Sequence, residues 1–280
     1  MRIVLLQIED RKTYILHQFM NHNKEICNEN EIEYIFMETT TFNVPPYWAK
    51  IFEIKKIFNE KPDVLYVMWL DSDAFFITRQ NKSLQHLLKT NESYSMIISN
   101  DMPPWNHVDF NAGSFIVKND RYGNEIIDKW ISLYNPENWK YADSKWTTDS
   151  VWAGNEYEQG SFVTHILNDD YYKPHILQLS YEVLNCPNCD NDNTLTVHLA
   201  GHYKEDVDIV SKCIRTITRV EGFDYFHSFN IKLPFMLILL NILAFLQFKK
   251  MKYSNLITWI IMGNCFILWV IYETDSKYST

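Results

Sequence analysis

Two aspartates, Asp71 and Asp73, end an apolar run in the segment WLDSDAFF at residues 69–76. Side chains at positions i and i+2 of an extended chain point to the same side, so the two carboxylates can converge on one cation. Such a pair repels itself unless a cation or a proton lies between the carboxylates. Hard oxygen ligands suit Mg²⁺ or Mn²⁺, which also bind phosphate oxygens. The pair predicts a metal site, and a solvated acidic turn is the alternative interpretation.

A second polar cluster, HLAGHYK at residues 198–204, follows another apolar run. His198 closes the predicted strand, where a histidine is either a ligand or a structural residue with satisfied hydrogen bonds. Gly201 lets the backbone approach a ligand closely, and Lys204 can reach a phosphate. The cluster is therefore a candidate phosphate-binding segment.

Two further segments carry polar residues beside predicted elements, NAGSFIVKN at 111–119 and TTDSVW at 147–152. In the first, small residues lead into a strand, which indicates a close approach of the backbone to a neighbour. In the second, we expect a helix to begin near Thr148, with Asp149 at its start. Asp149 there is either functional or simply favoured by the helix dipole.

The chain has five cysteines, too few for a disulfide framework in a chain of this length. Cys186 and Cys189 form a CPNC segment that is compatible with a zinc site, a small disulfide or an inert turn. Only eight residues separate Cys189 from His198, whereas a zinc finger has about twelve. The remaining cysteines are expected to be packed or membrane-embedded thiols: Cys27, Cys213 and Cys265.

The elements that position these residues follow from the hydrophobic pattern. Strands are predicted at 1–8, 33–37, 63–70, 94–99, 112–118 and 194–199, and helices at 11–30, 48–59, 81–90, 121–134 and 204–220. Residues 135–147 are predicted to form a loop rich in Trp and Tyr. Strands that alternate with helices indicate an α/β sheet that is at least partly parallel. An open α/β sheet places its ligand crevice at the carboxyl ends of its strands, which is where Asp71 and Asp73 stand.

Composition changes after about residue 230. Two strongly apolar segments, 233–248 and 256–272, are each about 17 residues long, near the lower limit for crossing a bilayer. We expect a catalytic domain at 1–225 and a C-terminal two-helix membrane hairpin at 226–280, with a shallow monotopic hairpin as the alternative.

Two features bear on the orientation expected of such a multi-pass membrane protein. The basic loop between the apolar segments favours a cytosolic loop and a catalytic domain on the far side. The lack of a cleavable N-terminal signal favours a cytosolic catalytic domain, and this is the expectation we adopt.

The net charge of −9 disfavours nucleic acid as a partner, because phosphate backbones are bound by basic faces. A nucleotide diphosphate is still compatible, because one bound metal ion neutralises it locally. The aromatic content of 15% is explained by core packing or by sugar-stacking surfaces. The tryptophans considered for stacking are Trp105, Trp139, Trp146 and Trp152.

Taken together and in order, WLDSDAFF, NAGSFIVKN, TTDSVW and VHLAG resemble the family 34 glycosyltransferases, which include yeast α-galactosyl- and α-mannosyltransferases and plant xyloglucan xylosyltransferases. The segment YWAKIFEIKKIF is also similar, and the resemblance covers roughly residues 1–205. It implies a GT-A fold with a Rossmann-like mixed sheet. It also implies a manganese-dependent, retaining transfer of a sugar from a nucleotide-sugar donor, with a UDP-hexose as first candidate, to a glycan or glycoconjugate.

The resemblance also implies roles for individual residues. Asp71 and Asp73 match the metal and nucleotide pair, and His198 matches the third metal ligand. Gly201 and the lysine after it, Lys204, match the diphosphate contacts. Other positions match the surroundings of the donor sugar and acceptor: Asn111, Gly113 and Asp149.

The chain departs from the family pattern in three respects. The family has Asp-Gln where this chain has Asp149-Ser150, and Tyr203 occupies the expected position of the diphosphate lysine. The membrane anchor of the family is N-terminal, whereas the apolar segments here are C-terminal. Either Asp149 or the departing phosphate is the candidate base for the acceptor hydroxyl.

Two other functions are alternatives to glycosyl transfer. An aspartate-nucleophile phosphatase has a hydroxyl residue or glycine soon after its second Asp, whereas Ala74, Phe75 and Phe76 follow here. A non-catalytic, membrane-tethered sugar- or nucleotide-binding protein would have lost a metal ligand, whereas all three candidates are present.

Overall fold

The computed structural model describes residues 1–218 except for 10, 12, 39–42, 78–83, 106–107, 144, 190 and 192. These residues form the first compact unit of the chain, Met1–Thr218. The predicted boundary at 225/226 and both apolar segments, 233–248 and 256–272, lie outside the described residues. Among the described helices, none has both the length and the apolar character needed to cross a bilayer.

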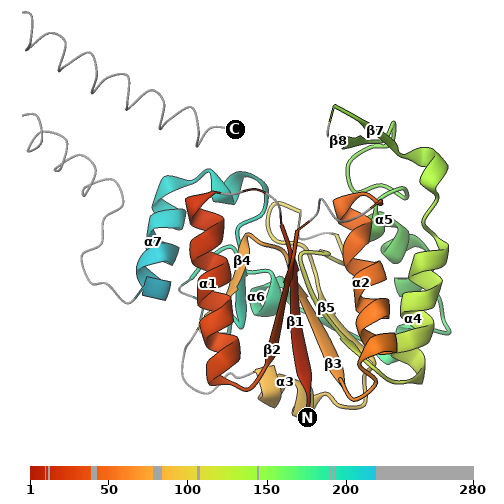
Figure 1. Cartoon of the computed structure of the whole chain (residues 1–280), viewed down its shortest axis with the longest axis horizontal. Coiled ribbons are helices and arrows are strands. Elements are labelled where there is room, and N and C mark those ends of the chain that lie inside the picture. The colour runs from red at the N-terminus through yellow and green to blue at the C-terminus, as the bar shows by residue number, and fades with distance from the viewer. Residues whose placement is uncertain are drawn as a thin grey trace, which may run out of the picture. The chain divides into compact units, whose positions relative to one another are not determined.

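Six strands form a central sheet in the order β2-β1-β3-β6-β5-β9 (Figure 1). Their bounds are β1 Ile3–Ile8, β2 Glu33–Met37, β3 Tyr66–Leu70, β5 Met96–Ser99, β6 Ser114–Lys118 and β9 Ile176–Leu179. β6 runs antiparallel to both of its neighbours, and the other pairs are parallel. β1 and β3 are buried along their whole length, as expected for strands covered on both faces. The predicted mixed α/β sheet is confirmed.

The reversal of β6 brings two polar segments to one edge of the sheet. β3 ends where β6 begins, and Leu70 pairs with Ser114. The next backbone contact is a hydrogen bond of 2.7 Å from the Asp71 N–H to the Gly113 carbonyl. The acidic segment after β3 and the small-residue segment before β6 therefore lie side by side, although about 40 residues separate them in the sequence.

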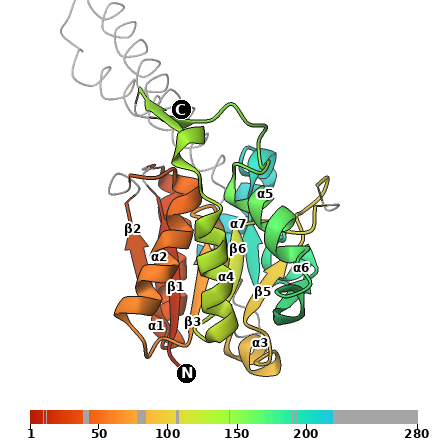
Figure 2. The same cartoon turned by 90° about the vertical axis from the view of Figure 1, so that its right-hand side faces the viewer.

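Helices cover both faces of the sheet. Their bounds are α1 Tyr14–Glu29, α2 Pro46–Glu60, α3 Leu84–Thr90, α4 Arg121–Ser132, α5 Glu158–Phe162, α6 Tyr181–Leu184 and α7 Val207–Thr218. Figure 2 shows α2 and α4 side by side on the face turned to the viewer, and α1 lies on the other face beside α7 (Figure 1). Each face has its own apolar core, one centred on Trp48 and Trp130 and the other on Leu5 and Met68.

A second, two-stranded sheet joins β4 (Ala74–Phe76) to β10 (Thr196–His198) in antiparallel pairing. His198 pairs with Ala74, so the histidine lies directly beside the acidic segment. Helix α1 fixes this sheet through Asn23, whose side chain donates to the Ala74 carbonyl at 2.9 Å and accepts from the Phe76 N–H at 3.0 Å.

Most predicted elements are confirmed, with shifts at their ends, but the region from 135 to 157 differs. The predicted loop contains a short hairpin, β7 (Lys140–Ala142) and β8 (Lys145–Thr147), with Asp143 at φ +50° in its turn. Asp tolerates this left-handed conformation better than most residues. The prediction of a helix near Thr148 was wrong, because α5 begins at Glu158. Strand β9 was not predicted.

The structure also corrects the cysteine predictions. Cys189 forms a disulfide with Cys213 of α7, so Cys213 is not an ordinary packed thiol. The zinc site and the small disulfide within CPNC, two of the three alternatives, are wrong, because Cys189 is bonded to Cys213 and Cys186 is a free, buried thiol. The observed disulfide ties α7 to the segment that precedes β10, and so supports the strand that carries His198.

We predict that Cys213→Ser lowers the free energy of unfolding by about 3 kcal/mol, because the disulfide closes a loop with a sequence separation of 24. Urea unfolding with and without a reductant measures this. The reductant should destabilise the parent protein by a similar amount and leave the variant unchanged. Equal stability of the parent in both conditions would contradict the prediction.

Candidate active site

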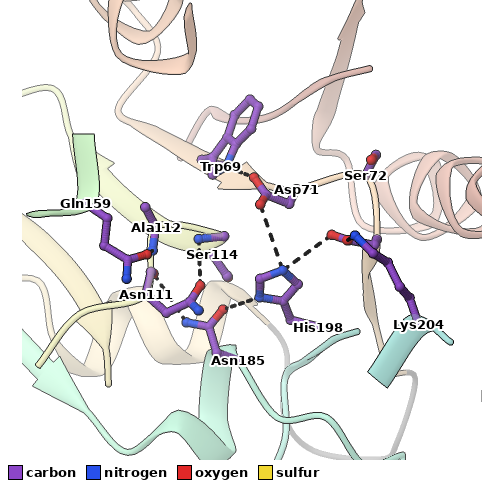
Figure 3. Close-up of polar contacts among 12 residues, drawn as sticks. Trp69, Asp71, Ser72, Asn111, Ala112, Ser114, Gln159, Asn185, His198 and Lys204 are labelled. Atoms are coloured by element: carbon purple, nitrogen blue, oxygen red, sulfur yellow. Dashed lines mark hydrogen bonds and ion pairs between the residues drawn. The ribbon is translucent and has the colours of Figure 1, made fainter. Parts of the chain in front are cut away.

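Three sequence-predicted ligands meet at the edge of the sheet. Asp71 follows β3, Asp73 precedes β4 and His198 ends β10. Figure 3 shows the side chains of Asp71 and His198 directed toward each other. The His198 Nε2 lies 3.3 Å from an Asp73 carboxylate oxygen and 3.8 Å from the Asp71 Oδ2. One potential ligand atom from each residue lies within 4.8 Å of the others. This arrangement brings together a donor set of two carboxylate oxygens and one imidazole nitrogen.

Asp71 is held by two donors on one side. Its Oδ1 accepts hydrogen bonds from the Trp69 indole N–H at 2.8 Å and from the Lys50 ammonium at 3.3 Å. Its Oδ2 is the oxygen that faces His198. The carboxylate therefore has a fixed orientation that directs one oxygen toward the shared centre.

His198 is oriented by Asn185. The Asn185 side-chain N–H donates to the Ser99 hydroxyl at 2.7 Å, so its Oδ1 is the acceptor that faces His198 Nδ1 at 2.9 Å. This arrangement places a proton on Nδ1 and directs Nε2 toward the carboxylates. A hydrogen bond of this kind on the far nitrogen is usual for histidines that bind metal ions.

The three groups also influence each other's protonation. Burial by itself would raise the pKa of Asp73, but the hydrogen bond and charge of His198, together with Lys204, lower it to about 2. Burial likewise disfavours the charged form of His198, yet Asp73 and Asp71 raise the pKa of its imidazole. A cation that binds between these atoms would compete with the proton on Nε2.

The donor set fits a divalent cation. Carboxylate oxygens suit Mg²⁺ and Mn²⁺, whereas imidazole nitrogen is more typical of Mn²⁺-to-Zn²⁺ transition metals than of Mg²⁺. The predicted roles of Asp71, Asp73 and His198 are thus consistent with a divalent metal, and the donor set leaves the identity of the ion open.

Gly113 and Asn111 shape the backbone beside the candidate metal ligands. A Cβ at Gly113 would lie 2.0 Å from His198 Cε1, so only glycine leaves room for the imidazole ring. The Asn111 Oδ1 accepts from the Gly113 N–H at 2.8 Å, and its amide donates to Asp101 at 2.6 Å. Both predicted residues are at the site, where Asn111 fixes the turn that makes room for His198.

Gly201 and Lys204 lie above the carboxylates, in a short 3-10 helix, η5 (Gly201–Lys204). Gly201 has φ +57°, a conformation that favours glycine. The Lys204 ammonium lies 3.5 Å from an Asp73 oxygen. Tyr203 is directed elsewhere, because its hydroxyl donates to the Pro103 carbonyl at 2.7 Å. The short helix therefore presents Lys204, not Tyr203, to the site.

Asp149 is not brought to this centre. Its side chain is 94% exposed and pairs with Lys140 of the β7–β8 hairpin at 3.2 Å. The residues that reach the centre from this part of the chain are Glu158 and Gln159, at the start of α5. The Gln159 side-chain oxygen accepts from the Ala112 N–H at 3.0 Å.

Lys50 of α2 is the central residue that the sequence analysis missed. Its buried ammonium lies 3.3 Å from Asp71, 3.1 Å from Glu158 and 3.1 Å from the Ala112 carbonyl. These three acceptors use all three of its donors. Burial disfavours the charge, yet Asp71 and Glu158 raise the pKa of Lys50. One signal in the sequence could have revealed it. Lys50 has the helical spacing from Ile54 and Ile57 that places it on the same buried face of α2.

One open cleft of ≈ 1700 Å³ is lined by most of the residues at this centre: Lys50, Asp71, Asp73, Asn111, Gly113, Glu158, Gln159, His198, Gly201 and Lys204. Its floor is polar and holds the carboxylates, His198 and Lys50. Of the tryptophans considered for sugar stacking, Trp139 is buried in the core, which explains it by packing. The others line the cleft: Trp105, Trp146 and Trp152.

Residues 2–108 match the sequence pattern of the galactosyl transferase GMA12/MNN10 family, glycosyltransferase family 34. The chain is 25% identical over 211 residues to an uncharacterised α-1,2-galactosyltransferase of Schizosaccharomyces pombe, a match that covers 65% of this chain and 54% of that protein. Over the matched residues, the chain is similar to the family 34 glycosyltransferases.

The chain shows a similar resemblance to other glycosyltransferases. A galactomannan galactosyltransferase of Cyamopsis tetragonoloba is 26% identical over 138 residues, which cover 48% of this chain and 30% of that protein. The chain thus spans about half the length, or less, of these curated relatives. A crystal structure of a glycosyltransferase involved in glycosylation of the PBCV-1 major capsid aligns with a TM-score of 0.58 and 17% identity. The alignment covers 79% of this chain and 100% of that one, and shows the shared fold.

We predict that Lys50→Met lowers the free energy of unfolding by about 3 kcal/mol, because Glu158 stays buried without its partner. The double variant Lys50→Met/Glu158→Gln should recover more than about 1 kcal/mol of that loss. Urea unfolding of both variants at one pH measures the difference.

Lys55→Met is the matched control on the same helix. Lys55 pairs with the exposed Asp128, so its loss should cost no more than about 1 kcal/mol. Equal stability of Lys50→Met and Lys55→Met would contradict a stabilising role of the buried Lys50–Glu158 ion pair.

Proposed function

We propose that this protein is a metal-dependent glycosyltransferase that moves a hexose or pentose from a nucleotide-sugar donor to a hydroxyl of a glycan or glycoconjugate. A UDP-sugar is the first candidate donor and Mn²⁺ the first candidate ion, with Mg²⁺ as the alternative. The observation that carries the proposal is the convergence of Asp71, Asp73, His198 and Lys204 at one end of a large cleft. The similarity to family 34 glycosyltransferases supports it.

The chemistry follows from where charge develops. When the bond between sugar and diphosphate breaks, negative charge builds up on the departing phosphate oxygen. A divalent cation bound by Asp71, Asp73 and His198 would act as a Lewis acid toward the diphosphate. Lys204 supplies a second positive group, and its exposed ammonium can move from Asp73 to a phosphate oxygen.

The residues around these groups keep the site organised. Lys50 and Trp69 fix Asp71, and Asn185 fixes His198, so the negative oxygens and Nε2 need not reorient when the donor binds. Gly113 leaves room for the His198 ring, and Gly201 permits the positive φ of +57° at the start of the short helix that carries Lys204. Such preorganisation is the main contribution that a protein makes to this kind of transfer.

The geometry disfavours two carboxylates as the base that accepts the proton of the acceptor hydroxyl. Asp149 is exposed outside the cleft, and Glu158 is engaged by the Lys50 ammonium. We therefore propose that the departing phosphate itself accepts the proton of the attacking hydroxyl, which accords with transfer that retains the anomeric configuration. The aspartate-nucleophile phosphatase interpretation finds no support in the comparisons.

We also propose that residues 226–280 attach the protein to a membrane through a two-helix hairpin. Disulfides are rare in the cytosol, so Cys189–Cys213 favours a catalytic domain on the oxidising side of that membrane. The basic loop between the apolar segments favours the same orientation. This orientation is the reverse of the cytosolic placement expected from the N-terminus.

We predict that the full-length protein with Mn²⁺ releases the nucleotide from one member of a panel of UDP- and GDP-sugars, and that Asp73→Ala reduces this release at least 100-fold. The reason is that the variant loses a carboxylate that binds the cation next to the leaving group. Nucleotide release is measured by a coupled assay, with and without a chelator.

Asp170→Ala is the matched control, because it removes an exposed carboxylate that is far from Asp73 in the sequence. Nucleotide release by this variant should stay within twofold of the parent. Release that persists in Asp73→Ala, or in excess chelator, would contradict metal-dependent transfer. A folded parent that releases nucleotide from no donor, with or without acceptor glycans, would favour a non-catalytic binding protein.

A further inference from the structure

Besides its polar floor, the cleft has exposed aromatic residues in its lining. Trp152 and Tyr141 are 70% and 62% exposed, and both line the cleft together with Trp146. Figure 1 shows the β7–β8 hairpin, which carries Tyr141 and Trp146, beyond the edge of the central sheet. Large aromatic side chains left open to solvent beside a polar site are typical of a ligand-binding surface.

These exposed rings are held in place by other rings. The Trp152 indole makes edge contacts with Tyr47 at 5.3 Å and with Tyr157 at 5.0 Å between centroids. Tyr141 and Trp146 face each other as a cross-strand pair of the hairpin, 5.1 Å apart. The rings thus have fixed orientations, so that stacking of a ligand on them costs little side-chain conformational entropy.

The backbone turn that carries Trp152 has a strained conformation. Ala153 has φ +55°, an unfavourable conformation for a residue with a side chain. The turn is closed by a hydrogen bond of 3.0 Å from the Gly154 N–H to the Val151 carbonyl. It packs so closely on α5 that a Cβ at Gly160 would lie 2.3 Å from the Gly154 carbonyl oxygen. Strain of this kind persists where the surrounding structure holds a functional conformation.

Polar side chains border the aromatic surface. Lys145, Asn155 and Thr164 line the same cleft, and the Thr164 hydroxyl donates to the Asn155 side chain at 2.8 Å. A sugar ring has an apolar C–H face and a rim of hydroxyl groups, which matches an aromatic face with a polar border. A nucleotide diphosphate requires positive charge instead, which Lys204 and a divalent cation bound by Asp71, Asp73 and His198 would supply.

We propose that this aromatic surface, formed by Tyr141, Trp146 and Trp152, binds the acceptor as an uncharged oligosaccharide, with one pyranose ring stacked on Trp152. This assignment rests on the proposed function and specifies its acceptor side. Because the rings line the same cleft as the metal ligands, an oligosaccharide bound there extends toward the donor. The hairpin and the turn at 151–154 are then the determinants of acceptor binding.

The test measures donor and acceptor reactions separately on the full-length chain. The protein is kept in a zwitterionic detergent, because a maltoside headgroup would itself offer glucose rings to the surface. The acceptor probes are cellohexaose, mannohexaose and maltohexaose, whose binding is followed by saturation-transfer difference NMR. Nucleotide release without acceptor reports on the donor site, and release stimulated by a hexasaccharide reports on transfer.

We expect Trp152→Ala to leave nucleotide release without acceptor within twofold of the parent and to weaken binding of the preferred hexasaccharide at least fivefold. The KM for that hexasaccharide should rise by a similar factor, with kcat within twofold. Trp152→Phe keeps a ring and should recover most of the affinity, which separates loss of stacking from loss of folding. Val151→Ala is the matched control, because Val151 is exposed on the same turn but does not line the cleft.

Three results would overturn the proposal. The first is unchanged hexasaccharide binding in a folded Trp152→Ala variant, and the second is a raised KM for the nucleotide sugar, which would assign the surface to the donor. The third is a parent that binds none of the hexasaccharides. If the parent releases no nucleotide but binds a hexasaccharide through Trp152, the surface assignment stands and the proposed transferase function fails.

Discussion

Asp71 and Asp73 bring two negative charges to the end of one strand, and much of the surrounding structure serves to hold them there. Like charges at this separation destabilise each other unless positive groups or a cation compensate. Lys50 compensates Asp71 from inside the protein, while His198 and Lys204 compensate Asp73 from the cleft. The carboxylates thus keep a fixed geometry, with oxygens turned toward a shared centre where a divalent cation fits.

The sheet explains how distant segments supply these groups. Because β6 is reversed between two otherwise parallel strands, the turn before it lies at the edge where β3 ends. The absence of a side chain at Gly113 then makes room for His198, which β10 brings in by pairing with β4. The disulfide Cys189–Cys213 ties the segment before β10 to α7. Each contribution is small, but together they position a single histidine.

The cleft has two chemically different ends, which agrees with a reaction between two different substrates. The polar end has fixed charges that suit a phosphate-bearing donor, and the aromatic end has rings in fixed orientations. A transfer reaction needs both substrates oriented toward one bond. A single cleft with two kinds of surface can hold them in that geometry. The buried Lys50–Glu158 pair joins α2 to α5 beneath the cleft, and thereby links the metal ligands to the helix that supports the aromatic turn.

The sequence by itself determined the mixed α/β class and singled out Asp71, Asp73 and His198 as candidate metal ligands, because apolar periodicity and strand-end position are local properties. It also indicated Gly113, Gly201 and Lys204, because close approach and phosphate reach follow from residue type. Only the tertiary structure decided what depends on contacts between distant segments. It placed Asp149 in solvent and Lys50 at the centre, and it paired Cys189 with Cys213. These outcomes depend on sheet order and helix packing, which bring together residues whose separation in the sequence carries no signal of their contact.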